Sequence, residues 1–215
     1  MDLTTKPEEY FSGGRPEMLT YIPTQAKRIL EIGCGEGNFG AFLKQKQGAE
    51  VWGVEFEPLH ADIARTKLDK VFAGDVAAVM SQLPQHYFEV IVCNDVLEHL
   101  TDPYTVLENL RNHLTPSGIV VSSIPNIRFF RTFFDFVFHK NWDYTDNGIM
   151  DKTHLRFFTI KSIPRMFENA GYEVVKLKGI NASKSIRPVL FNMLFLGFFP
   201  DIKFLQFAVV AKPRI

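Results

Sequence analysis

Short apolar runs alternate with longer stretches of mixed polarity along the first two thirds of the chain. Runs of four to six largely apolar residues bounded by turn formers are typical of strands buried in a parallel sheet. This pattern predicts five strands, at residues 28–32, 50–54, 70–73, 90–93 and 119–123.

The stretches between these runs carry the start and stop signals of helices. One helix is expected to begin at Gly37 and Asn38 and to end at Gly48, and a second follows Pro58, which suits a first helical turn. A third is expected over 104–113, before the turn formers of 115–118. Alternating strands and helices predict an α/β protein whose parallel sheet is covered on both faces.

The alternation lapses after Asn126, where about thirty residues of aromatics and turn formers follow. It resumes with a predicted helix over 160–170, and the two last strands are expected at 173–177 and 207–211. The irregular segment leaves the carboxyl end of the fifth strand, the edge at which open α/β sheets bind ligands. We therefore expect one domain, residues 1–215, with cap insertions at about 127–157 and 181–205.

A glycine-rich turn directly follows the first strand, where residues 28–40 read R-I-L-E-I-G-C-G-E-G-N-F-G. Glu55 ends the second strand, and Asp75 follows the third. Glycines let a ligand approach the backbone, and a carboxylate about 20 residues further on can accept hydrogen bonds from ribose hydroxyls. Together these features predict a site for a cofactor that contains adenosine.

The turn can be read in two ways. Gly35, Gly37 and Gly40 satisfy G-x-G-x-x-G, a dinucleotide fingerprint, with Glu55 lying 55 − 35 = 20 residues on. Alternatively, Gly33, Gly35 and Gly37 form E-x-G-x-G-x-G with the preceding Glu31. A dinucleotide enzyme requires neither Asp75 nor the string F-E-V-I-V-C-N-D-V-L-E-H-L at 88–100, which favours the second reading.

With that string the chain resembles the class I methyltransferases that depend on S-adenosylmethionine (SAM), in particular small-molecule members of the type 11/23 kind. The segments that carry the resemblance are L-E-I-G-C-G-E-G, V-W-G-V-E, F-A-G-D-V, F-E-V-I-V-C-N-D-V-L-E-H-L and L-T-P-S-G-I-V-V-S-S-I-P-N. It covers residues 10–158 and extends more loosely to the end. It implies a Rossmann-like, mostly parallel seven-stranded sheet with an antiparallel last strand, and SAM as the cofactor.

The resemblance assigns expected roles at the cofactor site. Glu31 would order the turn or favour the cofactor's positive charges, Glu55 would bind the ribose, and Asp75 the adenine amino group. Glu31 could instead serve only the helix dipole, and Asp75 could simply cap a helix beginning at Val76. The full expected cofactor-binding set is Glu31, Gly33, Gly35, Gly37, Glu55, Asp75, Val76, Asn94, Asp95, Tyr10 and Arg15.

Methyl transfer from a sulfonium is an in-line displacement, so the protein must align the acceptor and, for a hydroxyl, remove a proton. His99 and His154 are the candidate general bases, because an imidazole titrates near neutrality. Arg128 and Arg156 are candidates for binding an anionic group of the acceptor. The tract D-K-T-H-L-R-F-F-T at 151–159 resembles that of a bacterial or archaeal branch often involved in methylating polysaccharides or related acceptors.

Residues 95–99 and His154 include side chains that can bind a metal ion. Asp95-x-x-Glu98-His99, with His154, resembles the E-x-x-E-H metal site of ubiquinone-biosynthesis O-methyltransferases and of small-RNA 2′-O-methyltransferases. This chain has Asp at the first position, and the E-H pair is frequent in relatives that bind no metal. We therefore expect no metal to be required.

The charge balance and the residue composition of the chain indicate which partners and which cellular location to expect. Lys and Arg balance Asp and Glu at 24 each, without a basic stripe, which argues against nucleic acid. The N-terminal sequence lacks the apolar core of a signal peptide, and Cys34 and Cys93 are expected to be reduced, so a cytoplasmic location is expected. The 21 phenylalanines concentrate in residues 129–138 and 191–207. These segments are too short to span a membrane, and they could form a lid over the acceptor, a homodimer contact or a peripheral membrane contact.

The resemblance thus implies methyl transfer from SAM to a small-molecule or lipid- or sugar-linked acceptor, most simply at oxygen. Three alternatives remain at this stage: a metal-assisted nucleic-acid 2′-O-methyltransferase, a SAM-binding module without catalysis, and a nicotinamide-dependent oxidoreductase. The last is disfavoured because no second mononucleotide-binding half is visible.

Overall fold

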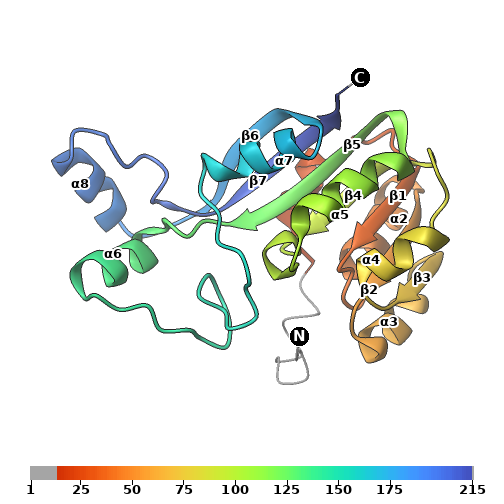
Figure 1. The fold of residues 1–215 in the computed structure, drawn as a ribbon, viewed down its shortest axis with the longest axis horizontal. Helices are drawn as coiled ribbons and strands as arrows, with labels where there is room; N and C mark the ends of the chain where they lie inside the picture. The colour runs from red at the N-terminus through yellow and green to blue at the C-terminus, as the bar shows by residue number, and fades with distance from the viewer. Residues whose placement is uncertain (1–13, 215) are drawn as a thin grey trace.

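The structure is a computed structural model that describes residues 14–214. These residues form one seven-stranded sheet in the order β3-β2-β1-β4-β5-β7-β6 (Figure 1). Strands β1 to β5 run parallel, and β7 runs antiparallel to both of its neighbours. The expected Rossmann-like sheet is therefore confirmed. The strands are β1 (Arg28–Ile32), β2 (Glu50–Glu55), β3 (Lys70–Ala73), β4 (Phe88–Asn94), β5 (Leu114–Pro125), β6 (Tyr172–Ala182) and β7 (Phe204–Pro213).

Helices cover both faces of the sheet, as the sequence predicted. One face packs against α4 (Val76–Val79), α5 (Pro103–Leu110) and α7 (Ser162–Asn169). The other packs against η1 (Pro16–Tyr21), α2 (Asn38–Gln47) and α3 (Pro58–Arg65). Three short 3-10 turns complete this part of the fold: η2 (Met80–Gln82), η3 (Leu97–His99) and η4 (Arg111–His113).

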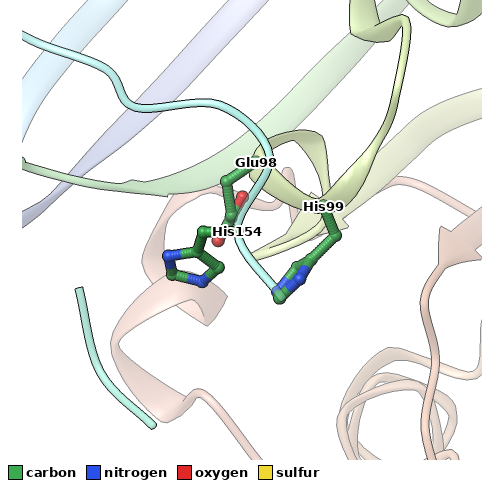
Figure 2. Close-up of side chains that lie close together, drawn as sticks. All are labelled: Glu98, His99 and His154. Atoms are coloured by element: carbon green, nitrogen blue, oxygen red, sulfur yellow. The ribbon is translucent and has the colours of Figure 1, made fainter. Parts of the chain in front are cut away.

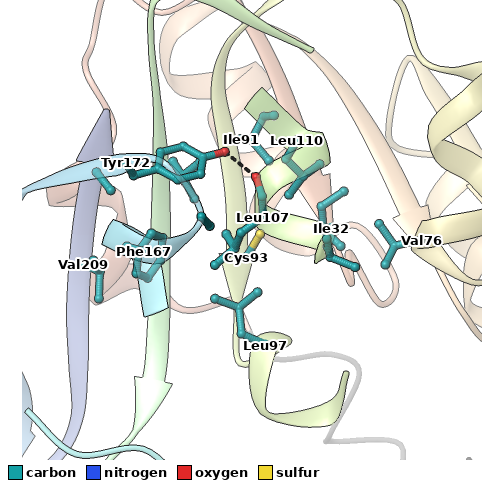
Figure 3. Packing of buried hydrophobic residues seen from close by; sticks show 14 of the residues in the cluster. Ile32, Val76, Ile91, Cys93, Leu97, Leu107, Leu110, Phe167, Tyr172 and Val209 are labelled. Atoms are coloured by element: carbon teal, nitrogen blue, oxygen red, sulfur yellow. Dashed lines mark hydrogen bonds between the residues drawn. The ribbon is translucent and has the colours of Figure 1, made fainter. Parts of the chain in front are cut away.

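The core on the α5 and α7 face joins helices to strands through large apolar side chains (Figure 3). Phe167 of α7 and Leu107 of α5 are fully buried beside Tyr172 of β6. The Tyr172 hydroxyl donates a 2.8 Å hydrogen bond to the Leu107 carbonyl, so this buried polar group is satisfied. Because side chains alternate along a strand, Leu30 and Ile32 face this core while Ile29 faces the other one.

The start of β5 differs from the prediction. Leu114 pairs with Phe88, and the next pair joins Ile119 to Val90. Five positions of β5 thus oppose two of β4, and residues 115–118 bulge out of the ladder. The turn formers predicted at 115–118 therefore lie within the strand as a bulge rather than before it.

Two helices lie in the segments that the sequence analysis left irregular, α6 (Phe130–Phe138) and α8 (Arg187–Leu194). They project together beyond the end of the sheet at the left of Figure 1. Rings of the two helices pack edge to face, with 5.7 Å between the centroids of Phe130 and Phe191 and 6.2 Å between those of Phe138 and Phe191. We call α6, α8 and the following residues 195–200 the phenylalanine lobe.

The base of the lobe is fixed by an ion pair between the half-buried Arg128 and the buried Asp201. Arg128 donates from Nε and Nη2 to the two carboxylate oxygens of Asp201, at 2.7 and 3.2 Å. Asn126 donates from Nδ2 to the carbonyls of Asp201 and Phe204, at 3.0 and 2.9 Å. Both ends of the lobe are thereby tied to the carboxyl end of β5 and to the start of β7.

Candidate functional site

The glycine turn between β1 and α2 has the backbone conformation that its sequence predicts. Gly33, Gly35 and Gly37 have φ angles of 67°, 52° and 76°, in the left-handed region that favours glycine. A Cβ atom at Gly33 would lie 2.5 Å from a methyl group of Val96. The amides of Gly33 and Cys34 donate to the carbonyl of Val54, which fixes the turn against β2. Glycine is therefore required here by both backbone conformation and space.

Glu55 connects the glycine turn to the end of β2. One of its carboxylate oxygens accepts from the amide of Gly35 at 2.7 Å, and the other accepts from the amide of Glu57 at 3.0 Å. Burial raises the pKa of the Glu55 carboxyl, and these amides oppose the shift. A carboxylate has about four lone-pair sites, so Glu55 can still accept hydrogen bonds from a ligand hydroxyl.

Glu31 lies on the α2 face of β1. Its Oε2 atom accepts a 3.1 Å hydrogen bond from the amide of Gly40, in the first turn of α2. Burial raises the pKa of this carboxyl to about 8, and the nearby Glu55 adds to the shift. This contact corresponds to the turn-ordering role considered from the sequence.

A pocket of about 740 Å³ lies at the carboxyl ends of the central parallel strands. This is the edge at which open α/β sheets bind ligands. Ten of the residues singled out from the sequence line it: Arg15, Glu31, Gly33, Gly35, Glu55, Asp75, Val76, Asn94, Asp95 and His99. Gly37, His154, Arg128 and Arg156 are not among the lining residues, and Tyr10 lies outside the described part of the chain.

Gly37 and Asp75 both serve helix starts. Gly37 is the N-cap of α2, and a Cβ there would lie 3.2 Å from the Cβ of Ala64 in α3. Asp75 accepts a 2.8 Å hydrogen bond from the amide of Ala77 and so caps α4. Since Asp75 also lines the pocket, the cap leaves its second carboxylate oxygen for a ligand.

Asp95 stands at the centre of a network that connects three distant parts of the chain. It has a left-handed φ of 52° and forms an ion pair with Arg15. Gln206 of β7 donates to Asp95 at 2.6 Å and accepts from Arg15 at 2.9 Å and from Asn181 at 2.8 Å. Gln206 was not foreseen, because no pattern marks a glutamine 111 residues from its partner.

Asn94 has a different environment from its neighbour. Both polar atoms of its side chain are buried and lack a hydrogen-bond partner, although the residue lines the pocket. Buried amide groups are nearly always hydrogen-bonded, so this pair of atoms fits contact with a polar ligand.

Glu98, His99 and His154 lie close together where the loop after α6 crosses η3 (Figure 2). The two imidazole rings meet edge to face, with centroids 4.6 Å apart. The Nδ1 atom of His99 lies 3.2 Å from the carbonyl of Thr153, and that of His154 lies 2.9 Å from the carbonyl of Ile149. Because a carbonyl can only accept, each imidazole carries its proton on Nδ1 when neutral.

These three residues could hold a metal ion, because each offers a ligand atom and all lie within 4.8 Å of one another. Glu98 is buried, its carboxylate oxygens have no hydrogen-bond partner, and burial raises its pKa to about 8. Asp95, the first residue of the motif compared with metal sites, is instead engaged by Arg15 and Gln206. That no metal is required remains a prediction.

The loop that returns from the lobe adds residues that the sequence analysis did not assign. Lys152, Thr153 and Leu155 line the pocket, and the ammonium of Lys152 forms an ion pair with Asp146 at 2.9 Å. The signal was present, since they belong to the tract D-K-T-H-L-R already quoted. Arg156 lies beside the pocket, where its guanidinium donates to the carbonyl of Thr101.

The two phenylalanine-rich segments do not line this pocket, whereas the end of the expected insertion at 127–157 does, through Lys152, Thr153 and Leu155. Among described residues, its lining includes no phenylalanine from 129–138 or 191–207, and Arg128 is engaged by Asp201. The physical reason lies in the length of β5. Ile124 and Pro125 extend past the last pair with β4 and pair only with β7, which carries the lobe beyond the pocket edge.

Comparison with known proteins supports this picture. A model of the methyltransferase domain family matches residues 7–177, so the chain belongs to this family. The fold is similar to that of a SAM-dependent methyltransferase from Archaeoglobus fulgidus, with a TM-score of 0.70, 22% identity, and 95% and 97% of the two chains covered. The resemblance read from the sequence is confirmed.

Two curated relatives match part of the chain. It is 29% identical over 128 residues to ubiquinone biosynthesis O-methyltransferase of Histophilus somni (strain 2336), covering 53% of each protein. It is 30% identical over 126 residues to trans-aconitate 2-methyltransferase of Methylobacterium radiotolerans, covering 58% of this chain and 48% of the relative. The match thus spans about half the length of these relatives.

Proposed function

We propose that the protein transfers a methyl group from SAM to an oxygen atom of a small-molecule or lipid- or sugar-linked acceptor. The observation that carries this proposal is one pocket lined both by the glycine turn with Glu55 and by His99 with Lys152. The first set suits an adenosine-containing cofactor, and the second suits an acceptor with an ionisable group. Membership of the methyltransferase domain family supports the reaction class.

The residues present fit the cofactor. Glu55 can accept from ribose hydroxyls, the free oxygen of Asp75 from an adenine amino group, and the unpaired amide of Asn94 can bond to the amino-acid portion. When bound, SAM supplies a methyl group on a positively charged sulfur. Glu31 and Glu55 are buried carboxyl groups that line the same pocket.

His99 is the proposed general base. Its Nδ1 proton is directed at the Thr153 carbonyl, so in the neutral ring Nε2 carries the lone pair that can take a proton from an acceptor hydroxyl. Thr153 thus acts as a positioning residue for the ring. His154 contacts His99 from the buried side and is proposed to hold its orientation.

Lys152, which lines the pocket, is proposed to bind an anionic acceptor in exchange for its exposed ion pair with Asp146, whereas the sequence candidates Arg128 and Arg156 do not line the pocket. One relative is named for trans-aconitate, which is a carboxylic acid. Because SAM is a cytosolic metabolite, we propose a cytoplasmic site of action. Among the described residues, no helix is long and apolar enough to cross a membrane.

The test is an assay with SAM labelled at its methyl group, run against hydroxylated and carboxylated metabolites and lipid-linked glycans. Transfer of label to an acceptor oxygen supports the proposal. Binding of SAM without transfer to any acceptor would favour the non-catalytic module, and transfer only to RNA would favour the nucleic-acid alternative.

His99→Asn should lower the rate of transfer by roughly 10²–10⁴-fold while leaving SAM affinity nearly unchanged.

A further inference from the structure

The phenylalanine lobe carries the densest group of exposed apolar side chains in the described chain. Leu196 is 92% exposed, Phe198 80%, Leu194 77% and Met193 68%. Elsewhere, Leu59 of α3 is similarly exposed at 69%, and exposed apolar residues in small numbers are ordinary for a protein surface. A contiguous apolar group of this kind marks a contact surface.

The arrangement of these side chains indicates what kind of partner covers them. Val189 and Met193 form one row along α8, and Leu190 and Leu194 form a second row about 100° around the helix. Residues 195–200, which we call the tip of the lobe, follow α8 and add the exposed side chains of Phe195, Leu196 and Phe198. A flat protein surface would cover only one of these two rows. The apolar part of a membrane, which surrounds an inserted helix, would cover both rows of α8 and the tip.

The charge of the lobe together with its flanking residues indicates the polar part of that medium. Within the lobe itself, Arg131 and Arg187 outnumber one acid, Asp135. Residues 128–140 and 183–203 contain six Lys and Arg and two Asp, a formal charge of 6 − 2 = +4, in a chain whose total is zero. Asp201 is paired with Arg128, and Asp135 contacts His139 at 3.0 Å. The cations that carry the surplus are Arg131, Lys140, Lys184, Arg187 and Lys203.

Polar and apolar features meet in a groove between α6 and α8 of about 840 Å³. Arg131, Arg187 and Ser185 line it together with Phe134 and Phe191. Asp135 and His139, which contact each other, line it as well. Guanidinium and hydroxyl groups beside aromatic rings match a phosphate headgroup that is joined to an apolar chain.

We propose that the phenylalanine lobe docks the protein on a membrane that contains anionic phospholipids, with the tip and α8 in the acyl boundary and Arg131 and Arg187 on headgroup phosphates. The eight residues of α8 are about 12 Å long, which reaches the boundary without crossing the bilayer of about 30 Å. Exposed Trp142 and Tyr144 follow α6 in the chain, and such amphipathic rings suit the headgroup level.

Docking would also connect the membrane to the pocket. Ring contacts run from Phe136 to Trp142 at 5.2 Å, to Phe157 at 5.6 Å, to His154 at 6.4 Å and to His99 at 4.6 Å between centroids. His99 lines the pocket. This row of packed rings joins the lobe to a residue of the pocket. That an amphiphilic acceptor reaches the pocket from the membrane rests on the proposed function, whereas the docking itself does not.

Flotation of the full chain with vesicles tests the docking without any methyl transfer. Vesicles of phosphatidylcholine alone are compared with vesicles that contain 30% phosphatidylglycerol, at low and high salt. We expect binding to the anionic vesicles that weakens at high salt. The double variant Leu196→Ser/Phe198→Ser should lower the bound fraction at least tenfold, and Arg131→Gln/Arg187→Gln should remove the preference for phosphatidylglycerol.

Matched variants separate docking from misfolding and from the proposed function. Leu59→Ser removes an apolar side chain of similar exposure on α3, and Lys46→Gln/Lys178→Gln removes two exposed charges elsewhere; both should bind vesicles as the wild type does. All variants should keep wild-type SAM affinity. Absence of vesicle binding by the wild type, or unchanged binding by the tip variant, would overturn the proposal. A dimer that the tip variant converts to a monomer, without vesicle binding, would assign the surface to a second copy of the chain.

Discussion

At the scale of single residues, Glu55 ties the glycine turn to β2 through the amides of Gly35 and Glu57. We expect Glu55→Gln to weaken SAM binding by about 1–3 kcal/mol, or roughly 5–150-fold, because it removes a charged acceptor and presents an amide donor to those N–H groups. Calorimetric titration measures this. Glu57→Gln is the matched control, since Glu57 does not line the pocket, and equal affinity of both variants would exclude Glu55 from the cofactor site.

A second residue-scale prediction concerns Glu31, whose pKa is raised from 4.5 to about 8 by burial. Between these values the folded chain holds a proton on Glu31 that the unfolded chain has lost. The free energy of unfolding should therefore fall as pH rises from about 5 to 8, by at most about 1.4 kcal/mol per unit from this group.

Denaturant titrations of the cofactor-free protein at several pH values check this sign. Glu98 shifts in the same direction, so the slope from Glu31 is taken as the difference between the wild type and Glu31→Gln. The glutamine keeps an acceptor for the amide of Gly40. Identical slopes for the two proteins would show that Glu31 is ionised in the folded state.

At the scale of elements, the sequence predicted the strands and the α2 and α3 helices because their apolar runs and glycine or proline boundaries are local signals. It missed α6, although Phe130, Phe134 and Phe138 recur at the four-residue spacing of a helix. A helical period is recognised when polar residues occupy the positions between the apolar ones. Here further phenylalanines occupy some of those positions, so the period is hidden. It also missed α8, whose apolar residues lie on more than one side.

The ion pair at the base of the lobe gives an element-scale prediction. Arg128→Met leaves Asp201, which is 4% exposed, without its partner. We expect a loss of about 1–3 kcal/mol in unfolding free energy, with SAM affinity unchanged because Arg128 lies outside the pocket. Adding Asp201→Asn should recover part of the loss in a double-mutant cycle. A fall in acceptor turnover without a fall in stability would restore Arg128 to acceptor binding.

At the scale of the whole molecule, the family resemblance implied seven strands with an antiparallel last one. The parallel sheet with both faces covered and the pocket at its carboxyl edge followed from the strand–helix alternation and the glycine turn. Two features did not, because both depend on how distant segments meet. Gln206 reaches Asp95 only after β7 inserts between β5 and β6. The lobe lies beside the pocket because β5 extends two residues beyond its last pair with β4. No local sequence pattern marks the length of a strand or its register.

The last prediction concerns a metal ion at Glu98, His99 and His154, which come from η3 and a loop more than fifty residues later. Three ligand atoms converge, but the carboxylate of Asp95 is held by Arg15 and Gln206, and the adjacent guanidinium repels a cation. We therefore expect EDTA to leave methyl transfer within about twofold of its untreated rate. Thermal unfolding with and without Mg²⁺, Mn²⁺ or Zn²⁺ provides a readout that does not depend on turnover. Loss of activity in EDTA that Mg²⁺ or Mn²⁺ restores in the wild type, together with a metal-induced stabilisation absent from Glu98→Gln, would place a catalytic metal at this cluster.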